Sequence, residues 1–353
     1  MRAIIAWHFD PETGSPYWLR RAQTLGFDPR RDVRGFADLA RFPPVADEWR
    51  TVPAADLIPR GARGPFAVWE TGGTTGPPRR IVDARERYRG VLRISRILDL
   101  HGFPGAHRGP RDEHVPDPAA GDWLHVGPSG PHLVGTSVAR LARLRGSLCH
   151  TVDLDPRWVK RLYRAGRLDE VRRYTAHVIE QALAILRTQP VTVVTTTPPL
   201  LQALCEHPEA YERLRARVKG IIWFGTSLSD EALRLLEEEL LPGVTVVGWY
   251  GNTLMGIACQ RPRRPGDPHR CVFVPPSPGA VVRLVDPRDP SREVGYGEEG
   301  QVRLSVLTRE LFLPWHLERD RAIRVPPSLP DPWDGLARVA PLGGSGPEVE
   351  GVY

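Results

Sequence analysis

The chain has 353 residues, of which 41% are hydrophobic and 25% charged, and its formal net charge is +6. A single hydrophobic core stops growing at roughly 250 to 300 residues, so we expect one large domain with sub-lobes or two domains rather than a small binding module. No apolar run reaches the roughly 18 residues of a membrane span, and the apolar start is too short for a signal peptide. We therefore predict a cytoplasmic protein without a membrane partner.

The basic charge does not indicate a nucleic-acid partner. Arginines alternate with acidic residues, and no cluster of basic and aromatic residues stands out. Lys160 and Lys219 are the only lysines, which leaves two candidates for any mechanism that needs a catalytic lysine. None of the cysteines forms a CxxC pair, and four in a chain of this length predict reduced thiols rather than a disulfide framework.

The predicted elements divide the chain into four parts. Residues 1–65 contain short, proline-punctuated segments typical of a helical lobe. In residues 66–258, apolar strand-like runs alternate with helical patterns, which predicts an α/β core with mostly parallel sheets. Residues 259–340 change to short strands and turns, typical of a small antiparallel β-barrel-like lobe. Residues 341–353 form the last part. The predicted core strands are 66–70, 122–126, 191–195, 220–225 and 244–250, and the predicted helices are 85–100, 137–144, 155–187, 199–205 and 229–241.

The segment 71–79, Thr-Gly-Gly-Thr-Thr-Gly-Pro-Pro-Arg, is the strongest chemical signal. Glycines allow a backbone to approach phosphate closely, and the hydroxyl groups can donate hydrogen bonds to its oxygens. The lysine and spacing of a Walker loop are absent. A flexible glycine turn is the alternative, but the strand before the segment and the predicted helix after it favour a phosphate-binding loop.

This loop resembles the phosphate loop of the adenylate-forming superfamily, the acyl-CoA synthetases and their relatives. Other blocks follow in the order of that superfamily. They are Phe224–Ser229, similar to the adenine block, Gly248–Thr253, similar to the Tyr-Gly-x-Thr block, Gly297–Val302, similar to the Gly-Glu-x-Gly turn, and Glu318–Asp320, similar to the ribose segment. The phenylacetate-CoA ligase branch fits best, because Thr195–Leu200 resembles its Thr-Thr-Pro block and 127–135 its glycine-rich segment.

The resemblance implies the fold of the N-terminal domain of these enzymes, activation of a carboxylic acid with ATP and Mg²⁺, and a set of site residues. The implied catalytic residues are Thr74, Arg79 and Thr253, the last on the α-phosphate. The implied ATP or AMP contacts are Thr71, Gly73, Thr75 and Gly76 at the phosphates, Gly225, Thr226 and Ser227 at adenine, Tyr250 stacked on it, Trp249, Gly251 and Asn252 in the same block, and Asp320 at the ribose.

Three departures from the superfamily change this expectation. Leu254 stands where a glutamate usually binds Mg²⁺, and Pro77 and Arg79 stand where a loop lysine is usual. The hinge expected near Gly343 is not recognisable, so we interpret 341–353 as a remnant of the hinge and expect the C-terminal domain with its adenylation lysine to be absent. In this shortened form the chain resembles the acyl-protein synthetase and the adenylating component of aryl carboxylate reductase systems. We therefore expect an acyl-accepting partner, either a reductase or a carrier protein.

The wall of the acid pocket is predicted from aromatic and imidazole residues near strand ends, which suit a flat aromatic acid. These residues are His125, His132, Trp223 and Met255, together with Trp249. For each residue alone, packing in the core or a place on the surface is the competing interpretation.

Cys259, His269 and Cys271 form a possible zinc site, because thiolate and imidazole are zinc ligands, although a fourth ligand is not evident. A plain proline-rich loop is the alternative. The leading hypothesis for the whole chain is an acid-adenylating, AMP-forming ligase. The alternatives are a non-catalytic nucleotide- or acyl-binding subunit of a complex and a truncated CoA ligase.

Overall fold

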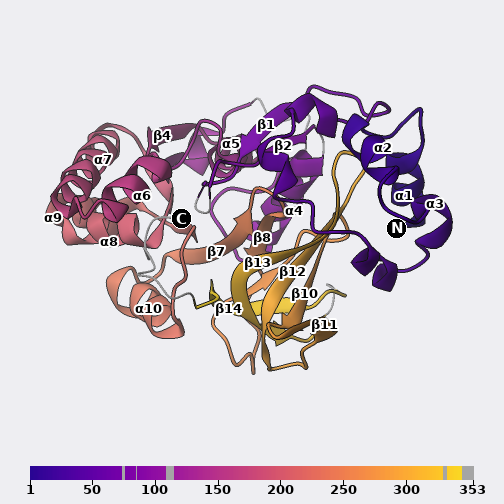
Figure 1. Ribbon diagram of the computed structural model, residues 1–353. Coiled ribbons are helices and arrows are strands. Elements are labelled where there is room, and N and C mark those ends of the chain that lie inside the picture. The colour runs from indigo at the N-terminus through magenta and orange to yellow at the C-terminus, as the bar shows by residue number, and fades with distance from the viewer. Residues whose placement is uncertain (74–75, 85, 109–114, 329–331, 344–353) are drawn as a thin grey trace. The chain divides into compact units, whose positions relative to one another are not determined.

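The computed structural model describes residues 1–73, 76–84, 86–108, 115–328 and 332–343 (Figure 1). The chain divides into two compact units, each built from separated segments. Unit 1 comprises 1–90, 252–257 and 275–335, and unit 2 comprises 91–251, 258–274 and 336–353. The division of the chain into the four predicted parts stays a prediction.

The sheet of unit 2 contains the predicted parallel core. The strands β3 (Asp122–Gly127), β4 (Cys149–Asp153), β5 (Val191–Thr196), β6 (Gly220–Phe224) and β7 (Thr245–Asn252) lie in the order β7-β6-β5-β3-β4, and the pairs among them are parallel. All residues of β6 are buried, as expected for a strand covered on both faces. The sheet continues from β7 through β8 (Gly256–Gln260), β9 (Val272–Val274) and β14 (Gly335–Pro341), with β9 antiparallel to β8 and β14.

Helices precede β3 and connect the parallel strands that follow it along the chain. They are α4 (Glu86–Leu100), η4 (Pro118–Ala120), α5 (Leu133–Leu144), α6 (Pro156–Arg164), α7 (Leu168–Thr188), α8 (Pro198–Glu206), α9 (Pro208–Arg217), α10 (Asp230–Leu235) and the π-helical turn η5 (Leu236–Leu240). Both α5 and α7 pack against β3 and β4, and α6 to α9 lie together in Figure 1. The single helix predicted over 155–187 is two helices, because Gly166 turns the chain with a φ of +68°.

The N-terminal stretch of unit 1 is helical, as its sequence pattern predicts. It contains α1 (Arg2–Phe9), α2 (Pro16–Ala22), α3 (Pro29–Asp32), η1 (Phe36–Arg41), η2 (Glu48–Arg50) and η3 (Ala54–Leu57). Its aromatic residues gather around Phe312: the ring of Trp18 lies 5.0 Å from that of Phe312, and the ring of Phe42 lies 5.4 Å from it. The Trp18 indole also donates a hydrogen bond to the Phe312 carbonyl oxygen at 3.0 Å. These contacts fix the N-terminal segment against β13 (Phe312–Val325).

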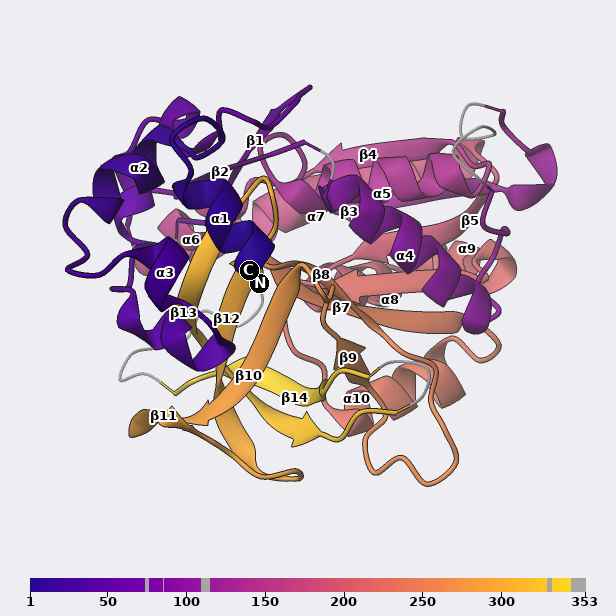
Figure 2. The same ribbon diagram turned by 90° about the vertical axis from the view of Figure 1, so that its right-hand side faces the viewer.

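The main sheet of unit 1 is antiparallel throughout. Its strands β10 (Ala280–Asp286), β11 (Asp289–Glu293), β12 (Glu299–Leu307) and β13 (Phe312–Val325) lie in the order β11-β10-β12-β13, and Figure 2 shows β10, β12 and β13 side by side. This confirms the predicted antiparallel lobe for these strands. A separate pair, β1 (Ala67–Glu70) and β2 (Arg80–Asp83), is also antiparallel.

The pairing of β1 with β2 corrects one expectation. The glycine-rich segment connects two strands of a hairpin, and α4 begins only after β2, so the predicted order of strand, loop and helix has an additional strand. Residues 80–83, Arg-Ile-Val-Asp, are too short to be separated from the following helix by pattern, although their last three residues are buried. None of the helices in the described ranges has both the length and the apolar character that crossing a membrane requires.

Candidate functional site

The glycine-rich segment is closed at its base by its own backbone. The Thr71 N–H donates to the Arg79 carbonyl oxygen at 3.1 Å, and the Arg79 N–H donates to the Thr71 hydroxyl at 2.9 Å. Gly73 and Gly76 have φ values of +63° and +139°, which residues with a side chain rarely adopt. Thr74 and Thr75, which the sequence predicts as phosphate contacts, lie outside the described residues. The described part forms a tight loop between β1 and β2, with Arg79 at its exit.

Two arginines flank this loop and share one carboxylate. Arg79 donates to Oδ1 of Asp47 at 2.6 Å, and Nε of Arg50 donates to the same oxygen at 3.0 Å. Arg50 also donates to the Pro77 carbonyl oxygen inside the loop. The Arg79 side chain holds the pKa of Asp47 below its usual value, with a smaller contribution from Arg50. Asp47 and Arg50 are functional candidates that the sequence did not single out.

The turn after β7 is held by Asn252. Its Oδ1 accepts hydrogen bonds from the backbone N–H groups of Leu254 at 2.9 Å and Met255 at 2.8 Å, and its side-chain amide donates to Glu318 at 2.9 Å. The Thr253 hydroxyl donates to the carbonyl oxygen of Glu70 at 3.3 Å. Glu70 is the last residue of β1 before the loop. The predicted residues Asn252 and Thr253 are thus joined to both β13 and the start of the glycine-rich loop.

Strand β13 has a bulge at Glu318–Asp320. Leu317 pairs with Arg303 and Arg321 with Gln301, so the three residues between them oppose only one residue of β12. The pKa of Glu318 is raised to about 7, mainly by burial and next by the nearby Asp320 carboxylate, while Arg79 and the Asn252 hydrogen bond act in the opposite direction. The bulge therefore places two carboxyl groups close together beside Asn252, and burial favours the neutral form of one of them.

His316 precedes the bulge on the same strand. Its side chain is 14% exposed, and Nε2 lies 4.0 Å from a Glu318 oxygen. The pKa of His316 is lowered to about 4, mainly by burial and also by the charges of Arg79 and Arg50, against the opposing effect of Asp47. The imidazole is therefore neutral at pH 7 and can donate one hydrogen bond without adding charge.

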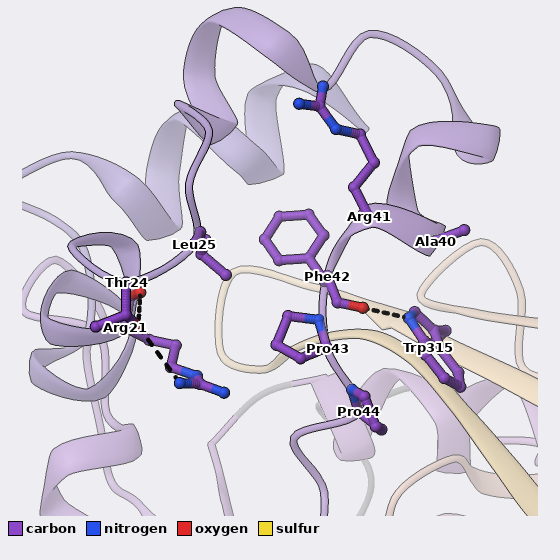
Figure 3. A pocket seen from close by; sticks show the side chains of 9 residues that line it. All are labelled: Arg21, Thr24, Leu25, Ala40, Arg41, Phe42, Pro43, Pro44 and Trp315. Atoms are coloured by element: carbon purple, nitrogen blue, oxygen red, sulfur yellow. Dashed lines mark hydrogen bonds between the residues drawn. The ribbon is translucent and has the colours of Figure 1, made fainter.

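A depression of about 570 Å³ lies beside these elements in unit 1 (Figure 3). Arg21, Phe42, Pro44 and Trp315 are among its lining residues, and the Trp315 indole donates to the Phe42 carbonyl oxygen at 2.8 Å. None of the residues that the sequence analysis predicts for the site lines it. The depression is therefore distinct from the group formed by the glycine-rich loop, the Asn252 turn and β13.

Unit 2 contains the predicted adenine block. Gly225 follows β6 with a φ of +90° and is exposed, as is Ser227, while Thr226 is half-buried. The loop ends at Ser229, whose hydroxyl accepts the Ala232 N–H at 3.1 Å and caps α10. Exposed backbone after a parallel strand is a usual place for ligand contacts in α/β folds.

The aromatic residues of the Tyr-Gly block differ in exposure. Trp249 is 3% exposed, while Tyr250 is half-buried, with its ring 5.9 Å from that of Phe273. Gly251 is exposed. Of the two aromatic residues, Tyr250 is the one with surface left for a stacked ligand.

The residues predicted to line an acid pocket are mostly buried. His125 is fully buried and stacks on Phe224. Because a carbonyl oxygen only accepts, Nε2 donates to the Pro128 carbonyl oxygen at 3.2 Å, and Nδ1 of the neutral ring accepts from the Thr195 hydroxyl at 2.8 Å. Burial lowers the pKa of His125 to about 4, so it is neutral at pH 7. Trp223 is 3% exposed and Met255 4%, whereas His132 is half-buried before α5. These environments favour the packing interpretation for His125 and Trp223.

The predicted zinc site is not supported. Within the described residues, no three His, Cys, Asp or Glu side chains form a group that could hold a metal ion, and Cys259, His269 and Cys271 are all described. Burial raises the pKa of the Cys259 thiol to about 12 and that of Cys271 well above its usual value. Both thiols are therefore protonated and behave as small apolar residues of β8 and β9.

Comparison with known proteins gives the fold but no family. No protein-family model and no curated protein matches the chain. Structures of 2-hydroxyisobutyryl-CoA ligase do match. One in complex with 2-HIB-AMP and CoA in the thioesterification state has a TM-score of 0.62, is 15% identical, and the match covers 97% of this chain and 66% of that one. One in the postadenylation state with R3-HIB-AMP has a TM-score of 0.60, is 15% identical, and the match covers 95% and 64%.

ATP-bound MatB from Rhodopseudomonas palustris matches less well, with a TM-score of 0.47, 17% identity and coverage of 77% of this chain and 47% of that one. The chain thus spans about half the length of MatB and about two thirds of the length of the 2-hydroxyisobutyryl-CoA ligase. The fold is that of the N-terminal domain of adenylate-forming enzymes, as the sequence blocks predict.

Proposed function

We propose that the chain activates a carboxylic acid with ATP to form an acyl-adenylate and pyrophosphate. The observation that supports this most is the meeting of three distant segments in unit 1. The Thr253 hydroxyl contacts the end of β1, and Asn252 contacts Glu318 in the bulge that also contains Asp320. These are the segments whose sequences resemble the phosphate loop, the Tyr-Gly-x-Thr block and the ribose segment of adenylate-forming enzymes.

In the proposed reaction, a carboxylate oxygen of the acid attacks the α-phosphorus of ATP. The bond from the α-phosphorus to its bridging oxygen breaks, and pyrophosphate leaves. Thr71 and Arg79 hold the phosphates, Thr253 donates to the α-phosphate, and Asp320 accepts hydrogen bonds from the ribose hydroxyls. The acid is already ionised at neutral pH, so the reaction needs no general base. Positioning and stabilisation of the developing negative charge supply the acceleration.

The described residues do not fit a magnesium site made by the protein alone. Leu254 occupies the position of the usual ligand and is 2% exposed, and among the described side chains no group of three potential ligands gathers. We therefore assign no catalytic step to a protein-bound Mg²⁺. The arginines at the loop supply positive charge to the phosphates instead.

The finer parts of the proposal rest on the sequence. We propose that the acid is aromatic, that a partner protein accepts the acyl group, and that the reaction takes place in the cytoplasm. Among the residues predicted for the wall of the acid pocket, His132 is half-buried, whereas the other four are buried. A panel of acids tests the first point, because benzoic acids should react faster than fatty acids of similar size.

A non-catalytic nucleotide-binding subunit is the second candidate. The buried Leu254 favours it, because the side chain at the usual magnesium position has no ligand atom. Such a subunit would bind ATP but would release no pyrophosphate with any acid or partner.

The distinguishing experiment measures pyrophosphate release from ATP and Mg²⁺ with benzoic, phenylacetic and fatty acids. Wild type is compared with Thr253→Val and Asp320→Asn, and Glu299→Gln, an exposed ion-paired residue on β12, is the matched control. Acid-dependent release that both site variants lose and the control keeps supports adenylation. ATP binding without release in wild type supports the subunit and contradicts the enzyme.

A further inference from the structure

The arrangement around Asp47 differs from an ordinary surface ion pair. The Arg50 and Arg79 side chains are only 15% and 14% exposed, whereas the Asp47 side chain that connects them is 74% exposed. Both guanidinium groups use the same oxygen of Asp47. Two largely buried guanidinium groups therefore share one solvated carboxylate, and the three side chains together carry a net positive charge.

Both arginines face the glycine-rich loop. Arg50 donates to the Pro77 carbonyl oxygen, and its Nη1 lies 3.6 Å from the position that a Cβ on Gly76 would occupy. Nε of Arg79 is buried and has no hydrogen-bond partner among the residues that the structure describes. The Nε group of Arg79 is thus a charged donor that can still form a hydrogen bond, and it lies in a cluster with the Arg50 guanidinium group. An anion that binds to this cluster would gain hydrogen bonds.

We propose that Arg50 and Arg79 form a pyrophosphate-binding pair, and that Asp47 occupies this pair until the terminal phosphates of a nucleotide displace it. The inference rests on the proposed function for the identity of the anion, but the binding step can be measured without any reaction. Arg50 comes from the N-terminal helical segment, so this segment contributes directly to the phosphate site.

The chemistry of the groups fits a polyphosphate. Planar guanidinium groups bind phosphate oxygens through two parallel hydrogen bonds, and a chain of two phosphates carries more charge than one carboxylate. Exchange of Asp47 for phosphate requires movement only of an exposed side chain.

The test uses calorimetric titration of the full chain with inorganic pyrophosphate and, separately, with AMP. Arg50→Gln and Arg79→Gln should each weaken pyrophosphate binding about tenfold or more, as expected for loss of a charged hydrogen bond. Asp47→Asn should strengthen it about fivefold, because the competing charge is removed. The exposed pair Arg20 and Asp56 provides the matched controls Arg20→Gln and Asp56→Asn, which should change nothing.

AMP lacks the terminal phosphates, so its affinity should be the same in all five variants, which also shows that each variant is folded. Unchanged or weaker pyrophosphate binding in Asp47→Asn overturns the proposal, as does unchanged binding in Arg50→Gln. If pyrophosphate binding follows the arginines while wild type releases none from ATP with any acid, the binding pair stands and the enzymatic function fails.

Discussion

Glu318 provides a quantitative prediction because its side chain is only 14% exposed and its pKa is raised from 4.5 to about 7. One pKa unit corresponds to about 1.36 kcal/mol, so the buried charge destabilises the folded chain by about 3 kcal/mol at pH 8. Below pH 4.5 the group is neutral in both the folded and unfolded chain, and this cost is absent. The stability is lost as the pH rises from about 4.5 to 7, because only the unfolded chain then releases the proton.

Glu318→Gln removes the charge and keeps the oxygen that accepts the Asn252 hydrogen bond. We expect the variant to be more stable than wild type by about 3 kcal/mol at pH 8 and equal to it near pH 4.5. Urea unfolding followed by tryptophan fluorescence at pH 4.5, 6, 7 and 8 measures the difference. Glu299→Gln, which removes an exposed ion pair with Arg321, should change stability by less than about 1 kcal/mol at every pH. A Glu318→Gln effect of the same size at all four pH values would refute the reasoning.

Two further predictions concern the turn and the core of unit 1. Asn252→Ala removes the acceptor for two backbone N–H groups and should therefore misplace Thr253. We expect kcat for pyrophosphate release to fall about tenfold to a hundredfold, with a smaller change in KM for ATP. A change in KM alone would contradict a positioning role. Phe312→Ala should destabilise the chain by about 3 to 5 kcal/mol in urea unfolding, since this ring is 1% exposed at the centre of the aromatic cluster. Phe36→Ala is the control, because a ring that is 52% exposed should contribute less than about 1 kcal/mol, and equal effects of the two changes would contradict the packing account.

The parallel core was predictable because its strands are buried on both faces. Val191–Thr196 is a short run of β-branched residues and Gly220–Phe224 a short apolar run, and both form strands at the expected positions. The strand β4 was not predicted. Only Val152 of its five residues is buried, so it shows neither a continuous apolar run nor a full alternation.

The site was predictable only where its residues lie in short motifs. Thr71, Thr253 and Asp320 belong to blocks with recognisable sequences, and the structure connects the segments that contain the first two through Glu70. Asp47 and Arg50 carry no local signal, because their role depends on the long-range packing of η2 beside the glycine-rich loop. Such contacts are set by tertiary structure and leave no periodicity in the sequence.

The burial of charged and polar groups was also beyond sequence reasoning. Glu318 belongs to the sequence block that resembles the ribose segment. Its raised pKa, however, follows from the bulge in β13, which places it beside Asn252 and Asp320. His125 was predicted as a wall of the acid pocket, but its ring is fully buried between β5 and Phe224. The alternation along a strand predicts on which face of the sheet a side chain lies. The packing of neighbouring elements decides whether that face of the sheet is exposed to solvent.

The most direct test of acid adenylation follows an oxygen atom. The acid that gives the most pyrophosphate is supplied with both carboxylate oxygens replaced by ¹⁸O, and the AMP formed after hydrolysis of the adenylate is analysed by mass spectrometry. Attack of the carboxylate on the α-phosphorus predicts AMP that carries one ¹⁸O atom, together with pyrophosphate. AMP without the label, or ADP and phosphate as products, would contradict the proposed reaction.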